Sequence, residues 1–341
     1  MGALNVHTKK HRLRLFGAAM LMLILVLAGC GSQTTEGGSG NEPTQPASSN
    51  TTSEGTTNTV TYTVKHAMDE TEIKGTPQKV VILTNEGTEA LLALGVTPVG
   101  AVKSWTGDPW YAHIKDQMEG VTVVGDESQP NLELIAGLQP DLIIGNKMRQ
   151  EKVYDQLKAI APTVMAEDLR GDWEINFKLY AEALNKTEEG AAKITEFNDR
   201  IADFKSKAGD KVNETVSVVR FMAGKTRIYH TDTFTGNIFA KIGLARTELT
   251  QNATEFVDEI TKERLPEADA DRLFYFTYDT GDGKGNDTET EMIQDPLWQN
   301  LSAVKNGRAY KVDDAVWNTA GGILAANLLL DELYGFYEIA E

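Results

Sequence analysis

The chain has 341 residues, of which 41% are hydrophobic, with one cysteine and a formal net charge of −17. A single cysteine excludes a disulfide framework and a cysteine-based metal site, and the acidic surface disfavours nucleic acid and anionic lipid headgroups as partners. The length is sufficient for two domains that each bury a core.

The first 29 residues have the pattern of an export signal. Four basic residues precede an apolar stretch at 15–28, which is shorter than the roughly 20 residues of a membrane span and has the length of a signal-peptide core. The stretch ends in Leu27-Ala28-Gly29-Cys30, which resembles the lipobox of bacterial lipoproteins, whose cysteine is lipidated after the preceding residues are removed. The alternative is an uncleaved anchor with a chance cysteine.

We therefore expect a signal peptide at 1–29 and a lipid such as palmitate on Cys30. The protein should be anchored at the outer face of the cytoplasmic membrane, in a Gram-positive cell. The mature chain then has 312 residues and a net charge of about −21, because the signal contains four basic and no acidic residues.

Residues 30–58 are mostly Gly, Ser, Thr, Asn, Gln and Pro. Such a segment cannot bury a core, so it is predicted to be a disordered tether. Order should begin near Val60, where the alternation of Val60-Thr61-Tyr62-Thr63-Val64 predicts a strand.

Short apolar strands alternate with helices between residues 79 and 164. Strands are predicted at 80–83, 99–102, 121–124, 141–144 and 162–164, and helices at 88–94, 132–136 and 151–160. This order favours a parallel sheet that is covered on both faces. We assign residues 59–187 to an N-terminal α/β lobe.

A long amphipathic helix is predicted at 188–209, because its apolar residues recur every three to four positions. A second α/β lobe follows at 210–341, with strands at 216–221, 228–229, 273–276 and 310–312, and a closing helix at 324–337. The expected fold is therefore α/β, with two lobes, each a mainly parallel sheet flanked by helices, joined by one long rigid helix.

The two lobes share a repeated pattern of two acidic residues. Glu133 precedes Asp141 by eight positions, and Glu263 precedes Asp271 by the same interval, with a strand after each aspartate. A duplicated lobe explains this spacing, although a weak α/β pattern also recurs by chance. Two similar lobes leave a cleft between them, which is a common place for a ligand.

The glycine-rich run at 281–285 follows a strand, and we expect it to form a solvated loop that does not open a helix. On that interpretation it is not a dinucleotide site. The histidines of the mature chain, His66, His113 and His230, are not paired at helical spacing. We therefore expect no bound bare metal ion and no cofactor.

Residues 60–337 resemble the ferric-siderophore and vitamin B12 class of substrate-binding lipoproteins that serve ABC importers, and four local runs carry the likeness. The runs are 89–100 (EALLALGVTPVG), 130–133 (PNLE), 139–144 (QPDLII) and 161–164 (APTV). Within that class the chain is similar to Gram-positive receptors for citrate-based siderophores. The resemblance implies a monomeric binding protein, not an enzyme, that delivers a ferric siderophore to permease subunits. Glu133 and Glu263 would then contact permease arginines, unless they are ordinary helix-start carboxylates.

The resemblance also implies ligand contacts. Arg149 matches a basic contact of the subgroup, although it could instead pair with Glu151 or Asp155 on the following helix. The other expected ligand-binding residues lie near strand ends or in loops: Arg220, Arg227, Tyr229, His230, Trp105, Trp173, Tyr278, Trp317 and Asn318. The tryptophans could equally belong to the core.

Two departures from the subgroup bear on the ligand. Asp126-Glu127-Ser128 stand where receptors for carboxylate-rich siderophores carry a basic residue, and the last loop, 317–322, has no arginine. A ligand with fewer free carboxylates, such as a hydroxamate-citrate siderophore, is therefore favoured. The alternatives are haem or a corrinoid with Tyr229 or His230 as axial ligand, an exported hydrolase, and a structural adhesin.

Overall fold

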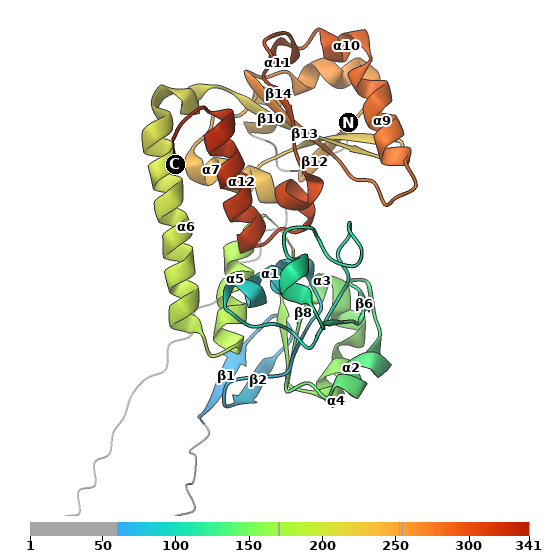
Figure 1. The fold of residues 1–341 in the computed structure, drawn as a ribbon, viewed down its shortest axis with the longest axis vertical. Coiled ribbons are helices and arrows are strands. Elements are labelled where there is room, and N and C mark those ends of the chain that lie inside the picture. Colours follow the sequence, from blue (N-terminus) through green and yellow to red (C-terminus); the bar gives the residue numbers. More distant parts are fainter. Residues whose placement is uncertain (1–59, 170, 252, 254, 341) are drawn as a thin grey trace, which may run out of the picture. The chain divides into compact units, whose positions relative to one another are not determined.

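The computed structural model describes residues 60–340 except 170, 252 and 254. The expected signal peptide, Cys30 and the tether lie outside these residues. Within the described residues the chain forms two five-stranded sheets flanked by helices, and a 22-residue helix, α6 (Thr187–Ala208), connects them. The predicted α/β class with two lobes and a long connecting helix is confirmed (Figure 1).

The sheet of the first lobe is entirely parallel, in the order β5-β4-β3-β8-β9. Its strand β3 is apolar on both faces because both faces are covered. Val80 and Ile82 belong to one buried cluster, and Val81 and Leu83 to another. The strands of this lobe, including two short antiparallel hairpins, are β1 (Thr61–Lys65), β2 (Glu70–Lys74), β3 (Val80–Ile82), β4 (Gly100–Ala101), β5 (Thr122–Val123), β6 (Gly125–Asp126), β7 (Gln129–Pro130), β8 (Leu142–Asn146) and β9 (Thr163–Ala166). Its helices are α1 (Asn85–Ala93), η1 (Lys115–Met118), α2 (Leu132–Leu138), α3 (Lys147–Gln150), η2 (Glu151–Val153), α4 (Tyr154–Ile160) and α5 (Trp173–Ala183).

The sheet of the second lobe is mixed, in the order β12-β11-β10-β13-β14. Strands β10, β13 and β14 are parallel, whereas β11 and β12 are antiparallel to their neighbours. Only two residues separate β10 from β11, and so short a connection can join only antiparallel strands. The strands are β10 (Val216–Met222), β11 (Lys225–Tyr229), β12 (Val257–Ile260), β13 (Arg272–Thr277) and β14 (Ala309–Lys311). The helices are η3 (Gly209–Asn213), α7 (Phe234–Ile242), α8 (Glu248–Gln251), η4 (Lys262–Ala268), α9 (Lys284–Ile293), α10 (Pro296–Gln299), α11 (Ser302–Lys305), a π-helix η5 (Ala315–Thr319) and α12 (Ile323–Phe336).

The two aspartates of the repeated pattern, Asp141 and Asp271, have the same structural role. Asp141 accepts hydrogen bonds from the backbone of Gln78 and Lys79, both at 2.9 Å, just before β3. Asp271 accepts one from the backbone of Thr215 at 2.8 Å, just before β10. Asp141 directly precedes β8 and Asp271 directly precedes β13, so each aspartate links the start of its own strand to the start of a parallel neighbour, β3 or β10. This shared role supports duplication of the lobe.

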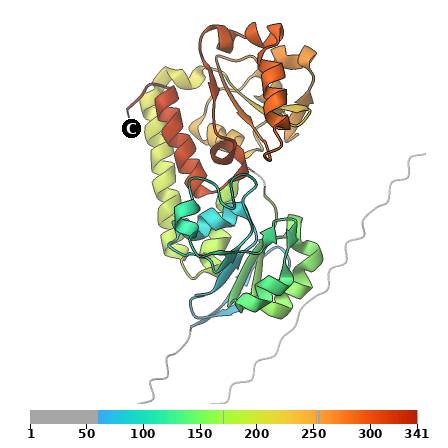
Figure 2. The same cartoon turned by 45° about the vertical axis from the view of Figure 1, so that its right-hand side comes forward.

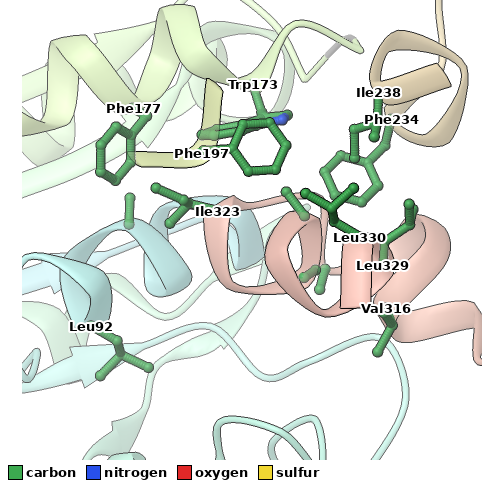
Figure 3. Close-up of a cluster of buried hydrophobic side chains, with 14 of the residues drawn as sticks. Leu92, Trp173, Phe177, Phe197, Phe234, Ile238, Val316, Ile323, Leu329 and Leu330 are labelled. Atoms are coloured by element: carbon green, nitrogen blue, oxygen red, sulfur yellow. The ribbon is translucent and has the colours of Figure 1, made fainter. Parts of the chain in front are cut away.

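One hydrophobic core extends through both lobes, and α12 lies in the middle of it. In Figure 3, Leu330 of α12 faces Phe234 and Ile238 of the second lobe, while Ile323 lies toward Phe177 of the first. Helix α12 also lies beside α6 in both ribbon views (Figure 2), and the rings of Phe204 and Tyr334 are 5.1 Å apart there. Opening the lobes widely would expose part of this core, which is unfavourable.

A buried carboxylate joins the lobes directly. Glu89 of α1 accepts a hydrogen bond from the backbone N–H of Ala325, at 2.9 Å, in the first turn of α12. The other oxygen of Glu89 lies 2.5 Å from Nε2 of His113. A carboxylate is favoured at this position because the first N–H groups of a helix have no partner within the helix. Gly322 permits the approach: a Cβ there would lie 2.6 Å from Glu89 Oε2 and 2.9 Å from the backbone oxygen of Glu86.

Replacing Gly322 by alanine should therefore force α1 and α12 apart and lower the free energy of unfolding by about 1–3 kcal/mol. Gly335, in the same helix, is the matched control, because a Cβ there would meet nothing within 4 Å. Gly335→Ala should raise stability by roughly 0.5–1 kcal/mol through helix propensity. Urea unfolding of both variants tests this, and equal stability of the two would contradict the close contact.

The interpretation of residues 281–285 as a loop that opens no helix is wrong, because α9 begins at Lys284. The carboxylate of Asp279 accepts hydrogen bonds from the backbone N–H groups of Gly281, Gly283, Gly285 and Asn286 at 2.8–3.2 Å. These hydrogen bonds offset the free-energy cost of the conformational entropy that the glycines lose when the turn is ordered. The protein's own carboxylate thus occupies the place at the start of α9 where a phosphate would bind.

Candidate functional site

A cavity of about 250 Å³ is lined by residues of both lobes. This volume is close to the lower limit of the roughly 300–1,000 Å³ typical of small-molecule sites. The lining residues are Glu86, Trp105, Glu127, Arg149, Leu169 and Gly171 from the first lobe, and Arg220, Phe234, Phe256, Tyr278, Asn318, Thr319, Ala320 and Gly321 from the second. Glu86, Arg149 and Tyr278 lie just after the carboxyl ends of β3, β8 and β13, where open α/β sheets commonly carry ligands.

Half of the ligand residues predicted from the sequence meet at this cavity. Trp105 and Arg149 reach it from the first lobe, and Arg220, Tyr278 and Asn318 from the second. Because the two groups are separated by about 70 residues or more along the chain, only the packing of the lobes brings them together.

The other five predicted residues do not line this cavity among the described residues. Trp173 and Trp317 lie in the hydrophobic core, with 1% and 0% of their surface exposed. The ring of Trp173 packs edge-on against Phe197, and the indole of Trp317 donates to Glu332 at 2.6 Å. Of the four predicted aromatic wall residues, Trp105 and Tyr278 line the cavity, together with Leu169, Phe234 and Phe256.

The remaining three predicted residues contact other groups of the protein: Tyr229, His230 and Arg227. The Tyr229 hydroxyl accepts a hydrogen bond from Arg220 at 3.0 Å, so it supports an arginine that lines the cavity. His230 contacts the Glu255 backbone oxygen at 2.7 Å and the Asp258 carboxylate at 3.1 Å. Both Tyr229 and His230, the axial ligands considered for haem, are 1% exposed, and neither lines the cavity among the described residues. Arg227 lies 3.6 Å from the Glu259 carboxylate.

Arg220 is held in a buried ion pair on the second-lobe wall. Its Nε and one terminal nitrogen donate to the two carboxylate oxygens of Asp314 at 2.7 and 3.1 Å. Its guanidinium also lies 4.7 Å from the centre of the Tyr278 ring. Burial by itself would lower the pKa of Arg220, but Tyr229 and Asp314 raise it above its usual value. This arginine is therefore a fixed positive charge at the cavity.

Arg149 has a similar but looser environment on the first-lobe wall. Its Nε lies 3.6 Å from the Glu127 carboxylate, and its guanidinium lies 5.9 Å from the centre of the Trp105 ring. The partner is neither Glu151 nor Asp155, the two carboxylates considered from the sequence. The Arg149 side chain is 39% exposed, compared with 8% for Arg220. Arg149 is thus the more accessible of the two cations to a ligand.

Glu86 and Glu127 are lining residues that the sequence did not identify as such. Glu86 accepts hydrogen bonds from Asn176 and Tyr180, both at 2.8 Å. Burial raises the pKa of Glu86 to about 8, so this carboxyl is largely protonated at neutral pH. Burial also raises the pKa of Glu127, against hydrogen bonds from Asn85 and the charge of Arg149. Their only signal in the sequence is their position: Glu86 follows a strand end, and Glu127 stands where the resemblance leads us to expect a basic residue.

The charges around the cavity nearly cancel. The arginines Arg149 and Arg220 face the carboxylates of Glu127 and Asp314, while protonated Glu86 adds no charge at neutral pH. Such a site can hydrogen-bond the oxygens of a chelate but attracts a strongly anionic ligand only weakly.

The two glutamates expected to contact a permease are both exposed. Glu133 lies in the first turn of α2, and Glu263 in the 3₁₀ helix η4. Among the helices of residues 60–340, the gaps aside, none is long and apolar enough to cross a bilayer.

Comparison with known proteins identifies the family. The model of the family described as "Periplasmic binding protein" matches residues 80–316. The chain is 50% identical to the "Probable siderophore-binding lipoprotein YfiY" of Bacillus subtilis, over 96% of this chain and 98% of that protein. It is 30% identical to the "Fe(3+)-citrate-binding protein YfmC" of the same organism, over 93% of this chain and 95% of the relative.

A solved structure agrees with these matches. Staphylococcus aureus SirA complexed with staphyloferrin B superposes with a TM-score of 0.76 and 37% sequence identity, covering 82% of this chain and 99% of that one. The proteins of this family are substrate-binding proteins and not enzymes. The two lobes, the cavity between them and the match over residues 80–316 agree, and the chain belongs to the periplasmic binding protein family.

Proposed function

We propose that this protein captures a ferric siderophore outside the cytoplasmic membrane and delivers it to the permease of an ABC importer. The observation that carries the proposal is the cavity with one arginine from each lobe, each beside an aromatic ring: Arg149 near Trp105 and Arg220 near Tyr278. Arginine suits a ferric chelate because it stays protonated and presents several donors to oxygen ligands. The names of the relatives YfiY, YfmC and SirA support the same ligand class.

Within this class we favour a hydroxamate-citrate siderophore. The support is the near cancellation of charge around the cavity, which disfavours a chelate with several free carboxylates. The aromatic faces of Trp105 and Tyr278 suit the carbon arms of such a ligand. The iron arrives already chelated, so the protein uses no cofactor of its own.

Titration with ferric chelates tests the proposal. Because Trp105 lines the cavity, a ferric hydroxamate-citrate chelate should quench tryptophan fluorescence saturably, and the iron-free chelator should do so more weakly. Haemin is the comparison for the alternative ligand, read from its visible absorbance. If haemin bound and no ferric chelate quenched the fluorescence, the proposed ligand class would be wrong.

We also propose that a lipid on Cys30 anchors the protein to the membrane. This residue lies outside the described part of the chain, so the proposal rests on the sequence. Two of the B. subtilis relatives, YfiY and YhfQ, are named lipoproteins. Cys30→Ser should move the protein from the membrane fraction to the medium without changing ligand affinity.

Delivery to the permease should depend on Glu133 and Glu263. Replacing both by alanine should abolish iron uptake and leave ligand affinity unchanged, because the two side chains are exposed and do not line the cavity. Glu72→Ala with Glu291→Ala is the control, since it removes two other exposed glutamates and the same charge. Normal uptake by the Glu133/Glu263 variant would remove these residues from the docking surface.

A further inference from the structure

Each arginine of the cavity faces a carboxylate of its own lobe, but the two pairs differ. Asp314 receives two nitrogens of Arg220 at 2.7 and 3.1 Å, so its charge is fully matched. Glu127 lies 3.6 Å from Nε of Arg149, beyond hydrogen-bond distance. The Glu127 carboxylate, on the wall of the cavity, is therefore less fully matched: Arg149 faces it only as a longer ion pair, and its other side-chain donors, Asn85 and Trp105, are neutral.

Glu127 cannot swing away when a ligand enters. One carboxylate oxygen accepts hydrogen bonds from both the backbone N–H and the side-chain amide of Asn85, each at 2.8 Å. Its backbone oxygen accepts a bond from Gln150 at 2.6 Å. The side chain is 4% exposed, so moving it would leave the buried donors of Asn85 unpaired, which is costly. The carboxylate therefore holds a fixed position on the wall.

A fixed carboxylate next to the more accessible arginine limits what can bind there. A free carboxylate of a ligand that approached Arg149 would meet Glu127 within a few ångströms in a poorly solvated cavity, where like charges repel strongly. A neutral oxygen, hydroxyl or N–H group meets no such penalty, and a donor could use the second oxygen of Glu127. We propose that Glu127 is a specificity-determining residue that rejects ferric chelates presenting a free carboxylate to Arg149 and admits those with neutral groups there.

This inference rests on the proposed function and names the charge class of the ligand. The test is Glu127→Gln, because the amide keeps an oxygen for the Asn85 donors and removes the charge. The affinity for ferric citrate, a carboxylate-rich chelate, should rise at least about tenfold, which is about 1.4 kcal/mol. The affinity for a ferric hydroxamate-citrate chelate should change less than about threefold.

Asp126→Asn is the matched control. It removes the same charge one residue away, and an asparagine oxygen can still accept the bonds from the Ser128 and Gln129 backbones at 2.9 Å. Asp126 does not line the cavity among the described residues, so neither affinity should change by more than about twofold. An equal gain in Asp126→Asn would mean that the overall field of the protein, and not Glu127, disfavours ferric citrate.

A comparison of two ligands on the wild-type protein does not depend on whether a variant folds. Two ferric chelates that differ only in one free carboxylate or its neutral amide should bind with at least a tenfold preference for the amide. If the wild type binds the hydroxamate-citrate chelate and Glu127→Gln leaves the affinity ratio unchanged, the function stands and this inference is overturned. If no ferric chelate binds the wild type, the proposed function fails, and this inference fails with it.

Discussion

Replacing Arg220 by alanine should lower the free energy of unfolding by about 3–5 kcal/mol, because it leaves a buried carboxylate without its partner. Asp314 is 5% exposed, and Arg220 supplies two of its hydrogen bonds while Thr319 supplies a third at 3.0 Å. Burial already raises the pKa of Asp314, and without the arginine its charge would be less stable still. Ligand affinity should fall as well, since the cation on the second-lobe wall is lost.

Urea unfolding of three variants separates the causes. Arg220→Ala with Asp314→Ala should recover part of the lost stability, because no buried charge then remains. Arg227→Ala is the matched control: Arg227 lies opposite Arg220 in the β10–β11 ladder but has only a partly exposed ion pair with Glu259. Its loss should cost less than about 1 kcal/mol. A similar small cost for Arg220→Ala would show that the Asp314 pair is not structural.

Replacing Arg149 by alanine should weaken ligand binding at least about tenfold and leave stability within about 1 kcal/mol of the wild type. Loss of a charged hydrogen-bond donor from a binding site typically costs about 2–5 kcal/mol, and the partial exposure of Arg149 places the expected effect at the lower end. Stability should be kept because Glu127 retains both hydrogen bonds from Asn85.

Two further variants make this prediction specific. Arg149→Lys should recover only part of the affinity, because the charge remains and the planar donor set does not. Lys147→Ala, in the same short helix, removes a cation that pairs with Glu167 outside the cavity, and it should bind as the wild type does. Wild-type affinity in Arg149→Ala would remove this arginine from the site. The contrast between Arg149 and Arg220 distinguishes a ligand contact from a residue that also supports the fold.

Periodicity in the sequence was sufficient to predict the elements whose stability depends on one repeating apolar face. The long helix was predicted at 188–209 and occurs at Thr187–Ala208, since its apolar residues recur at helical spacing. The start of α9 was missed because it depends on Asp279, whose carboxylate contacts backbone groups as far as seven residues ahead. Such a cap is a property of the folded turn and leaves no periodic signal.

For the site, the sequence was enough to show that Arg149 follows one apolar strand and that Arg220 lies near the end of another. In the structure both arginines line the cavity between the lobes. It could not decide between core and cavity for a tryptophan, because both environments are apolar. Trp317 is buried only once Phe239, Phe274 and Phe336, from three different elements, pack around its ring. Nor could it show which carboxylate each arginine would face. The pairs of Arg149 with Glu127 and of Arg220 with Asp314 join residues 22 and 94 positions apart, and electrostatic contacts at such separations exist only once the sheets have assembled.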